Sequence, residues 1–166
     1  GYMELPSRDE FFEIIKKAAI SKRLQRELRY VPDGISYPEQ RDFLVVTTKS
    51  GNEGVLLYEN FVLPFTLTAR AANSKGRVEP IICDICASWR RGTESAMITF
   101  AKSQRSSLTH LVCADLDCSL HVRNLTDAAR LSRVQLREQI DETERVERLV
   151  RRLTAISSEF RGIIGE

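Results

Sequence analysis

The chain has 166 residues, of which 42% are apolar and 29% are charged, with a formal net charge of +2. This length and composition are typical of one soluble globular domain with a substantial core, and acids and bases cancel too closely for the overall charge to indicate nucleic acid. No stretch reaches the roughly 18 apolar residues of a membrane helix, and charges replace the apolar core of a signal peptide, so we expect a cytoplasmic protein that does not bind membranes.

The first predicted element is a helix that begins at Ser7. Ser7 and Glu10 form a capping box, in which each side chain bonds the other residue's free backbone N–H. Apolar residues then recur at spacings of three and four, and the pattern continues weakly through Leu24 and Leu28 before Pro32 ends it. Basic residues follow its later turns, and we favour a solvated face that complements the helix dipole over a binding patch. They are Lys16, Lys17, Lys22, Arg23 and Arg26.

Strand patterns come next. Residues 43–48 and 55–58 are rich in β-branched and apolar residues, and the sequence SGN between them is turn chemistry, so they predict a β-hairpin. Residues 61–68 predict another strand, and Pro64 indicates that it lies at an edge or contains a bulge. Residues 69–75 form a polar connection.

Four cysteines stand in two close pairs, each of which ends a predicted strand. The pairs lie in the runs CDIC and CADLDC, after strands predicted at residues 78–82 and 108–112, with a further strand at 96–102 between them. Tetrahedral zinc takes four thiolates at about 2.3 Å, and two tight turns can supply them. A helical pattern follows the second pair, which completes a treble clef. We therefore expect one structural zinc ion, held by Cys83, Cys86, Cys113 and Cys118.

Other roles for these cysteines are less favoured. A redox pair or a disulfide needs no second pair, and cytosolic thiols are normally reduced. His110 and His121 flank the second pair and are alternative ligands, but four thiolates already close the site. Catalytic zinc needs an open position for water, and the sequence has no phosphate-binding loop, nucleophile elbow or metalloprotease helix. We expect no enzymatic activity, no catalytic residue and no small-molecule substrate.

The C-terminal part is predicted to be helical. Residues 124–140 are helical at least in part, and Asp141 and Glu144 form a second capping signal before an amphipathic helix. We expect the apolar stripe of that helix to pack on the core, with partner binding as the alternative. The stripe consists of Val146, Leu149, Val150, Leu153, Phe160 and Ile164.

Together these elements predict an α+β fold. A small antiparallel sheet is joined to an N-terminal helix, a four-cysteine treble-clef zinc finger and a C-terminal amphipathic helix. We place a helix and hairpin lobe at residues 1–68 and a zinc-finger lobe with the C-terminal helix at residues 69–166. The two lobes are expected to form one compact domain.

The sequences around the cysteines resemble those of the FusB-type elongation factor G-binding proteins. The runs CDIC, MITFAK and LVCADLDCSLHVR are similar to that family's two knuckles and the strand between them, including Asp115 two places after the third cysteine. Upstream, the helix start at Pro6 and Ser7 and the strand FLVVTT are also similar. The resemblance covers most of residues 5–123 and implies the treble-clef zinc finger known as the FBP domain.

The resemblance also implies a function. In that family the zinc-finger lobe binds the C-terminal domains of elongation factor G and releases the factor from ribosomes stalled by fusidic acid. Positions that match the contact surface are Ile82, Leu108, Leu111 and Leu149, and we expect Arg90, Arg91 and Lys102 to form a charged rim. Leu108 and Leu111 have the alternative of packing into the finger's own core, because side chains alternate along a strand.

A nucleic-acid-binding finger, for example on ribosomal RNA, is the alternative function. Residues 69–110 contain more basic than acidic side chains, which would suit phosphates. An acidic protein surface would suit them equally, and Trp89 alone is near enough in sequence to stack on a base. A protein partner is therefore favoured.

Overall fold

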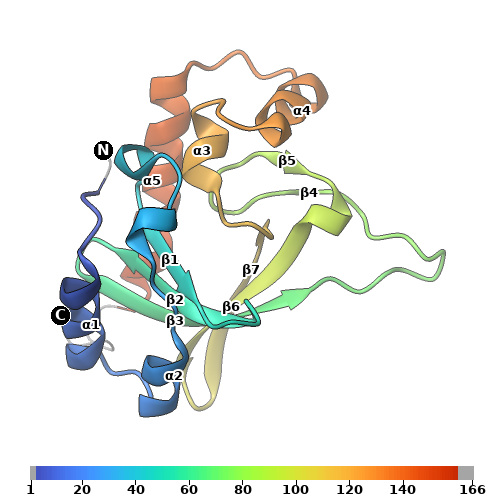
Figure 1. Ribbon diagram of the computed structural model, residues 1–166. Helices are drawn as coiled ribbons and strands as arrows, with labels where there is room; N and C mark the ends of the chain where they lie inside the picture. Colours follow the sequence, from blue (N-terminus) through green and yellow to red (C-terminus); the bar gives the residue numbers. More distant parts are fainter. Residues whose placement is uncertain (1–2, 161–166) are drawn as a thin grey trace.

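A five-stranded antiparallel sheet with the strand order β1-β2-β3-β6-β7 forms the centre of the computed structural model, which describes residues 3–160 (Figure 1). The predicted α+β class is confirmed. The strands of this sheet are β1 (Leu44–Thr47), β2 (Glu53–Tyr58), β3 (Phe61–Ala69), β6 (Ser95–Ser103) and β7 (Ser106–Cys113). A separate hairpin pairs β4 (Ile81–Ile82) with β5 (Trp89–Arg90).

The predicted hairpin is confirmed as β1 and β2. The Thr48 N–H donates to the Glu53 carbonyl at 2.9 Å, and the turn places Gly51 at a φ of +79°, which glycine adopts without steric cost.

The expectation that Pro64 marks an edge or a bulge is wrong, because β3 is the third of five strands. Pro64 pairs only with Val55 of β2, and pairing with β6 starts one residue later, at Phe65, so the missing N–H breaks no bond to β6.

The capping box at the start of the first helix is confirmed. The Ser7 N–H donates to Glu10 Oε1 at 3.0 Å, and the Glu10 N–H donates to Ser7 Oγ at 3.1 Å. The helix that follows, α1 (Arg8–Lys17), buries Phe11 and Ile15.

The single helix predicted to continue toward Pro32 is in fact two helices. Ala18 is extended, with a ψ of 155°, and ends α1. Ser21 then accepts from the Leu24 N–H at 3.1 Å and caps α2 (Lys22–Glu27). A serine placed three residues before a buried leucine is a second start signal. Two short 3₁₀ turns, η1 (Pro32–Gly34) and η2 (Pro38–Gln40), lead from there toward β1.

Each face of the sheet has its own core. On one face, α1 and α2 pack against β1, β2 and β3. On the other face, buried side chains of β2, β3, β6 and β7 and the partly buried Val45 of β1 meet the cysteines and α5. Alternation along the strands produces the two sets, since Leu44 and Val46 belong to the first core and Val45 to the second. The helices beyond the sheet are α3 (Cys118–Val122), α4 (Asp127–Leu136) and α5 (Glu142–Ser158).

The C-terminal helix packs on the core, as predicted from its apolar stripe. Asp141 caps α5 by accepting from the Glu144 N–H at 2.9 Å. Leu149 is 0% exposed, which contradicts the expectation that it contacts a partner. Ile164 lies outside the described residues. Among residues 3–160, no helix combines the length and apolarity that crossing a membrane requires.

Helices α1 and α2 cover their face of the sheet only over β1, β2 and β3. The same face continues over β6 and β7 through the paired residues Met97 and Leu111, and then Thr99 and Thr109, none of which is buried. Within the described residues, the core that α1 and α2 build takes no residue from β6 or β7. The polar connection predicted at residues 69–75 lies in an arm between β3 and β4 that projects from the sheet (Figure 1).

Candidate metal centre

The first cysteine pair lies in a tight turn between β4 and β5. The backbone N–H groups of Ile85 and Cys86 point at Cys83 Sγ, at 3.4 and 3.5 Å, and the Ala87 N–H donates to the Cys83 carbonyl at 2.8 Å. Ala87 closes the turn with a φ of +59°. The Ile85 and Cys86 amides place two donors beside the sulfur, which favours the thiolate form.

The second pair joins a strand to a helix, as the sequence predicts. Cys113 is the last residue of β7, and Cys118 is the first residue of α3. Between them the Leu116 N–H donates to the Cys113 carbonyl at 3.1 Å, and Leu116 has a φ of +53°. The chain thus reverses direction between the two ligands, and both thiols point to the first pair.

The four thiols converge on one point. All four are buried, and their sulfur atoms lie within 4.8 Å of one another. Cys83 Sγ lies 3.8 Å from Cys118 Sγ, and Cys86 Sγ lies 3.6 Å from Cys113 Sγ. A tetrahedron of sulfurs about 2.3 Å from zinc has edges of about 3.8 Å, so the spacing fits. The four cysteines form a zinc-binding site, and the predicted structural zinc is confirmed.

The electrostatics of the site explain why it needs a cation. Burial raises the pKa of Cys83, but hydrogen bonds from Cys113, Cys118 and Cys86 outweigh it and lower that pKa well below its usual value. The pKa of Cys118 is raised well above its usual value by its hydrogen bond with Cys113, then by those with Cys83 and Cys86, and by burial. The opposite directions of the two shifts reflect the strong interaction of thiols that are buried together, and a divalent cation makes four buried thiolates tolerable.

Asp84 ties the first knuckle to the sheet. Its N–H donates to the Leu111 carbonyl at 2.8 Å, and its Oδ2 accepts from the Leu111 N–H at 3.2 Å. His110 Nδ1 lies 3.2 Å from the same oxygen, and Arg152 of α5 donates to the Asp84 carbonyl at 3.1 Å. This role of Asp84 was not predicted from the sequence, although an acidic residue between two cysteine ligands is a visible signal.

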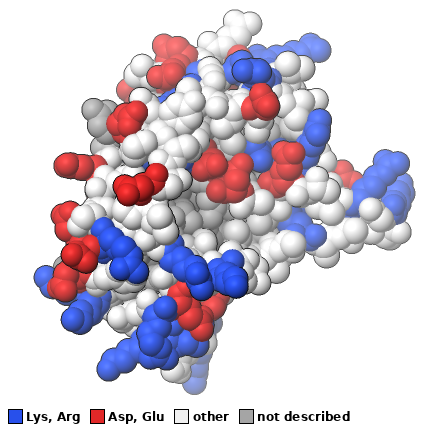
Figure 2. Space-filling view, viewed as in Figure 1, with Lys and Arg blue, Asp and Glu red and all other residues white. Residues whose placement is uncertain are grey.

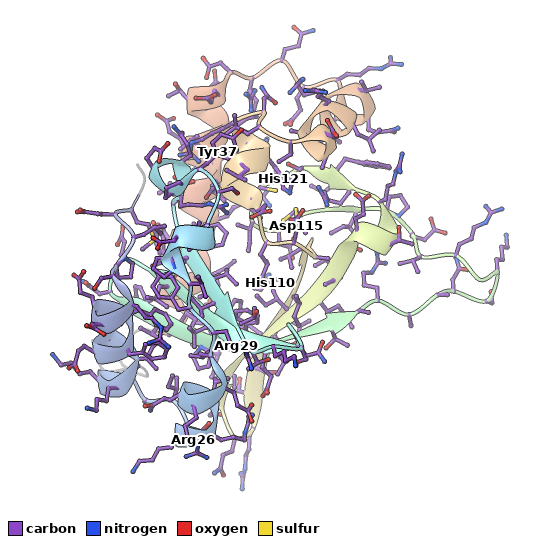
Figure 3. The ribbon with its side chains drawn as sticks, in the orientation of Figure 1. Arg26, Arg29, Tyr37, His110, Asp115 and His121 are labelled. Carbon is purple, nitrogen blue, oxygen red and sulfur yellow. The ribbon has the colours of Figure 1, made fainter. Side chains whose placement is uncertain are left out.

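His121 supports the second knuckle from the side (Figure 3). Its Nε2 lies 3.1 Å from Asp115 Oδ1, and its Nδ1 lies 2.7 Å from Thr126 Oγ1. Burial raises the pKa of Asp115, but the hydrogen bond and charge of His121 outweigh it and lower that pKa. Atoms of Asp115, His121 and Cys113 lie within 4.8 Å of one another, but Cys113 already belongs to the four-thiol site. Since both ring nitrogens of His121 have protein partners, we assign it to support of the knuckle.

Two residues predicted on the contact surface belong to the interior or to its lining. Arg90 is only 4% exposed and lies beside His121 and Asp115, so its assignment to a charged rim is wrong. Leu108 is partly buried and packs against the core that contains the cysteines.

The other predicted contact residues are accessible to different degrees. Ile82 is 43% exposed, Arg91 is exposed and Leu111 is partly buried. Lys102 is half-buried and lies 3.2 Å from Glu159 in an ion pair. Leu108 and Leu111 point to opposite faces of β7, because they stand an odd number of residues apart.

Comparison with protein families identifies a match over most of the chain. The model of the FBP C-terminal treble-clef zinc-finger matches residues 36–160, which include both cysteine pairs and all five strands of the sheet. The matched region begins after α2 and extends through α5, beyond the range that the sequence resemblance covered. No curated protein and no solved structure gives a significant match.

Proposed function

Since this chain belongs to the family of the FBP C-terminal treble-clef zinc finger, we propose that it is a protein-binding module whose partner is elongation factor G. The family and the four-cysteine site define a zinc-dependent module. The partner is the inference, and it extends the functional resemblance of the cysteine-centred sequences. Binding is proposed to release the factor from ribosomes stalled by fusidic acid, in the cytoplasm.

The observation that carries the proposal is the face of β6 and β7 that remains uncovered in the described structure. Met97 and Leu111 pair across these strands and are half-buried, and they extend an otherwise threonine-rich surface. Ile82 lies nearby on β4, which the hydrogen bonds of Asp84 join to β7. Apolar side chains on a rigid, metal-braced sheet are the kind of anchor that a protein interface uses.

The proposal assigns the zinc ion a structural role and the chain no turnover of its own. Four thiolates complete the tetrahedral coordination that zinc prefers, which leaves no position for water or a carbonyl oxygen. GTP hydrolysis seen in a mixture with the factor is therefore expected to be the factor's own.

Calorimetric titration with purified elongation factor G tests the partner and the face together. We expect Leu111→Asp and Ile82→Asp each to weaken binding by about 10- to 100-fold, because burying such a side chain contributes roughly 1.5–3 kcal/mol. Val134→Asp is the matched control, since Val134 is 71% exposed on α4, in another part of the molecule. Circular dichroism and zinc content confirm that each variant is folded.

The two parts of the proposal fail separately. If the parent chain with its zinc shows no binding to elongation factor G, the partner is wrong. If the parent binds and both aspartate variants bind as tightly as it does, the partner stands and the proposed face is wrong. A loss that Val134→Asp shows equally would also reject this face.

A further inference from the structure

A concentration of positive charge surrounds α2, at a distance from the zinc site (Figure 2). There a hollow of about 640 Å³ lies between α1, α2 and the turn that joins β1 to β2. The cations that line it are Arg8, Arg26, Arg29 and Lys49. They come from separate segments of the chain, so their convergence is a product of the fold and not of one helical face.

Within residues 3–160, the two acidic residues of the hollow form no ion pair with the cations that line it. Glu27 and Glu53 both bind Arg23, with nitrogen–oxygen distances of 2.7 and 2.9 Å. The hydrogen bond from Arg23 also lowers the pKa of Glu53, which favours its ionised form in this ion pair. Among the described residues, the side chains of Arg26 and Arg29 have no ion pair or hydrogen bond (Figure 3).

The backbone around the hollow is held in place. The Arg29 N–H donates to the Thr47 carbonyl at 3.0 Å, which fixes the end of α2 against β1, next to Lys49. Thr48 Oγ1 and Ser50 Oγ lie 3.2 Å apart at the same rim and offer hydroxyl groups. Guanidinium groups that have no partner in the described part of the chain, on a backbone held in place beside hydroxyl groups, are suited to bind phosphate oxygens.

We propose that this hollow and the cations around it bind the phosphate backbone of RNA. Lys16 and Lys22 line a second depression that shares Arg26 with the hollow, so the positive surface is longer than one phosphate needs. A polynucleotide can fill such a surface, because its successive phosphates each contact a cation and release counterions. This inference goes beyond the proposed function, since α1 and α2 precede the region that matches the family.

The composition of the hollow favours RNA over two other anionic partners. A protein interface is depleted in charged residues at its centre, whereas nucleic-acid interfaces are strongly positive and polar. An anionic membrane would need exposed apolar side chains beside the cations. Of the large apolar side chains exposed among residues 3–160, Val31 is the one that lines the hollow.

Fluorescence anisotropy with a short, labelled single-stranded RNA tests the proposal on the full chain with its zinc. The test variant carries Arg26→Gln, Arg29→Gln and Lys49→Gln, all at exposed positions. The control variant carries Arg130→Gln, Arg137→Gln and Arg151→Gln, which remove the same charge from exposed positions outside the hollow and outside residues 69–110. We expect the test variant to lose at least about tenfold in affinity at 0.1 M salt, and to lower the slope of log affinity against log salt by about 2.

Each further result has a definite meaning. Little change in the control variant supports a located site, whereas equal losses in both variants would overturn it in favour of diffuse attraction. Parent chain that shows no measurable RNA binding at 0.1 M salt would also overturn it. Polyglutamate or phosphatidylserine vesicles that bind the parent more tightly than RNA, and lose that binding in the test variant, would instead assign the surface to an acidic protein or to a membrane.

Discussion

The two faces of the sheet are covered in different ways. Segments that lie close in sequence cover one face, where α1 and α2 precede the strands on which they pack. Distant segments cover the other, where the turn between β4 and β5, α3 and α5 converge on the strands. Contacts between distant segments require longer loops to be ordered, which costs more conformational entropy. The zinc ion stabilises the face that contains the cysteines, where the entropic cost of ordering long loops is larger.

One buried ion pair connects the two regions. Asp42, just before β1, accepts two hydrogen bonds from Arg123 at 2.7 and 2.9 Å. The Asp42 N–H also donates to Ser119 Oγ of α3 at 3.0 Å. The second knuckle is thereby attached to the first strand of the sheet.

Replacing a zinc ligand should have the largest effect. Cys118→Ser is expected to lose the metal and to unfold the zinc-braced face, since structural zinc contributes on the order of 10 kcal/mol of apparent binding energy. Zinc analysis together with urea unfolding measures this, and chelation of the parent chain is the parallel treatment. A variant that keeps its fold without metal would show that the two faces do not differ in their need for it.

Breaking the buried ion pair should come next. Asp42→Ala leaves Arg123, whose side chain is 7% exposed, without its partner, and we expect a loss of about 3–5 kcal/mol in the free energy of unfolding. The double variant Asp42→Ala with Arg123→Met removes the stranded charge and should recover much of that loss. Urea unfolding of both variants checks this. Equal losses would mean that the pair itself, and not the stranded charge, sets the cost.

Two alanine substitutions, one in the core of each face, compare how closely each core is coupled to the zinc site. Leu153 of α5 and Ile15 of α1 are each 1% exposed, and either substitution by alanine should cost about 2–5 kcal/mol. Leu153 shares its core with the four cysteines, and Ile15 does not. Only Leu153→Ala is therefore expected to speed zinc transfer to a coloured chelator. Equal transfer rates in the two variants would contradict the separation of the cores.

The capping box should give the smallest effect, and it should depend on pH. The hydrogen bond from the Ser7 N–H lowers the pKa of Glu10 below its ordinary value of 4.5. Because the folded-state pKa is the lower one, the stabilisation is present above pH 4.5 and is lost as the pH falls through the folded-state pKa. Glu10→Gln should therefore unfold at a lower urea concentration than the parent at neutral pH. The gap between the two midpoints should shrink in acid, and a constant gap would exclude the carboxylate as its cause.

The features that the sequence predicted correctly are local. The cysteine spacing, the SGN turn and the caps at Ser7 and Asp141 each depend on a few neighbouring residues, and the structure confirms them. Ser21 was missed because it stands among good helix formers, where a cap is hard to distinguish from a helical serine.

The features that were predicted wrongly from the sequence depend on residues far away along the chain. Arg90 is buried because it meets Asp115 and His121, which lie 25 and 31 residues away. An arginine without such partners would lie on the surface, and nothing near it in sequence indicates otherwise. Pro64 was assigned to an edge because its missing N–H is a local property, whereas the point at which β6 begins to pair is not.

The bonds between Asp84 and Leu111 also protect the protein from self-association. β7 is the last strand of the sheet, and its outer edge carries backbone groups on which another chain could add a strand. The first knuckle occupies part of that edge, since the Asp84 N–H and carboxylate bind both backbone groups of Leu111. Loss of the metal would free the knuckle and uncover this part of the edge. In a cell short of zinc, the chain would then expose a strand edge on which other chains could aggregate. The zinc ion therefore also helps to keep the protein soluble.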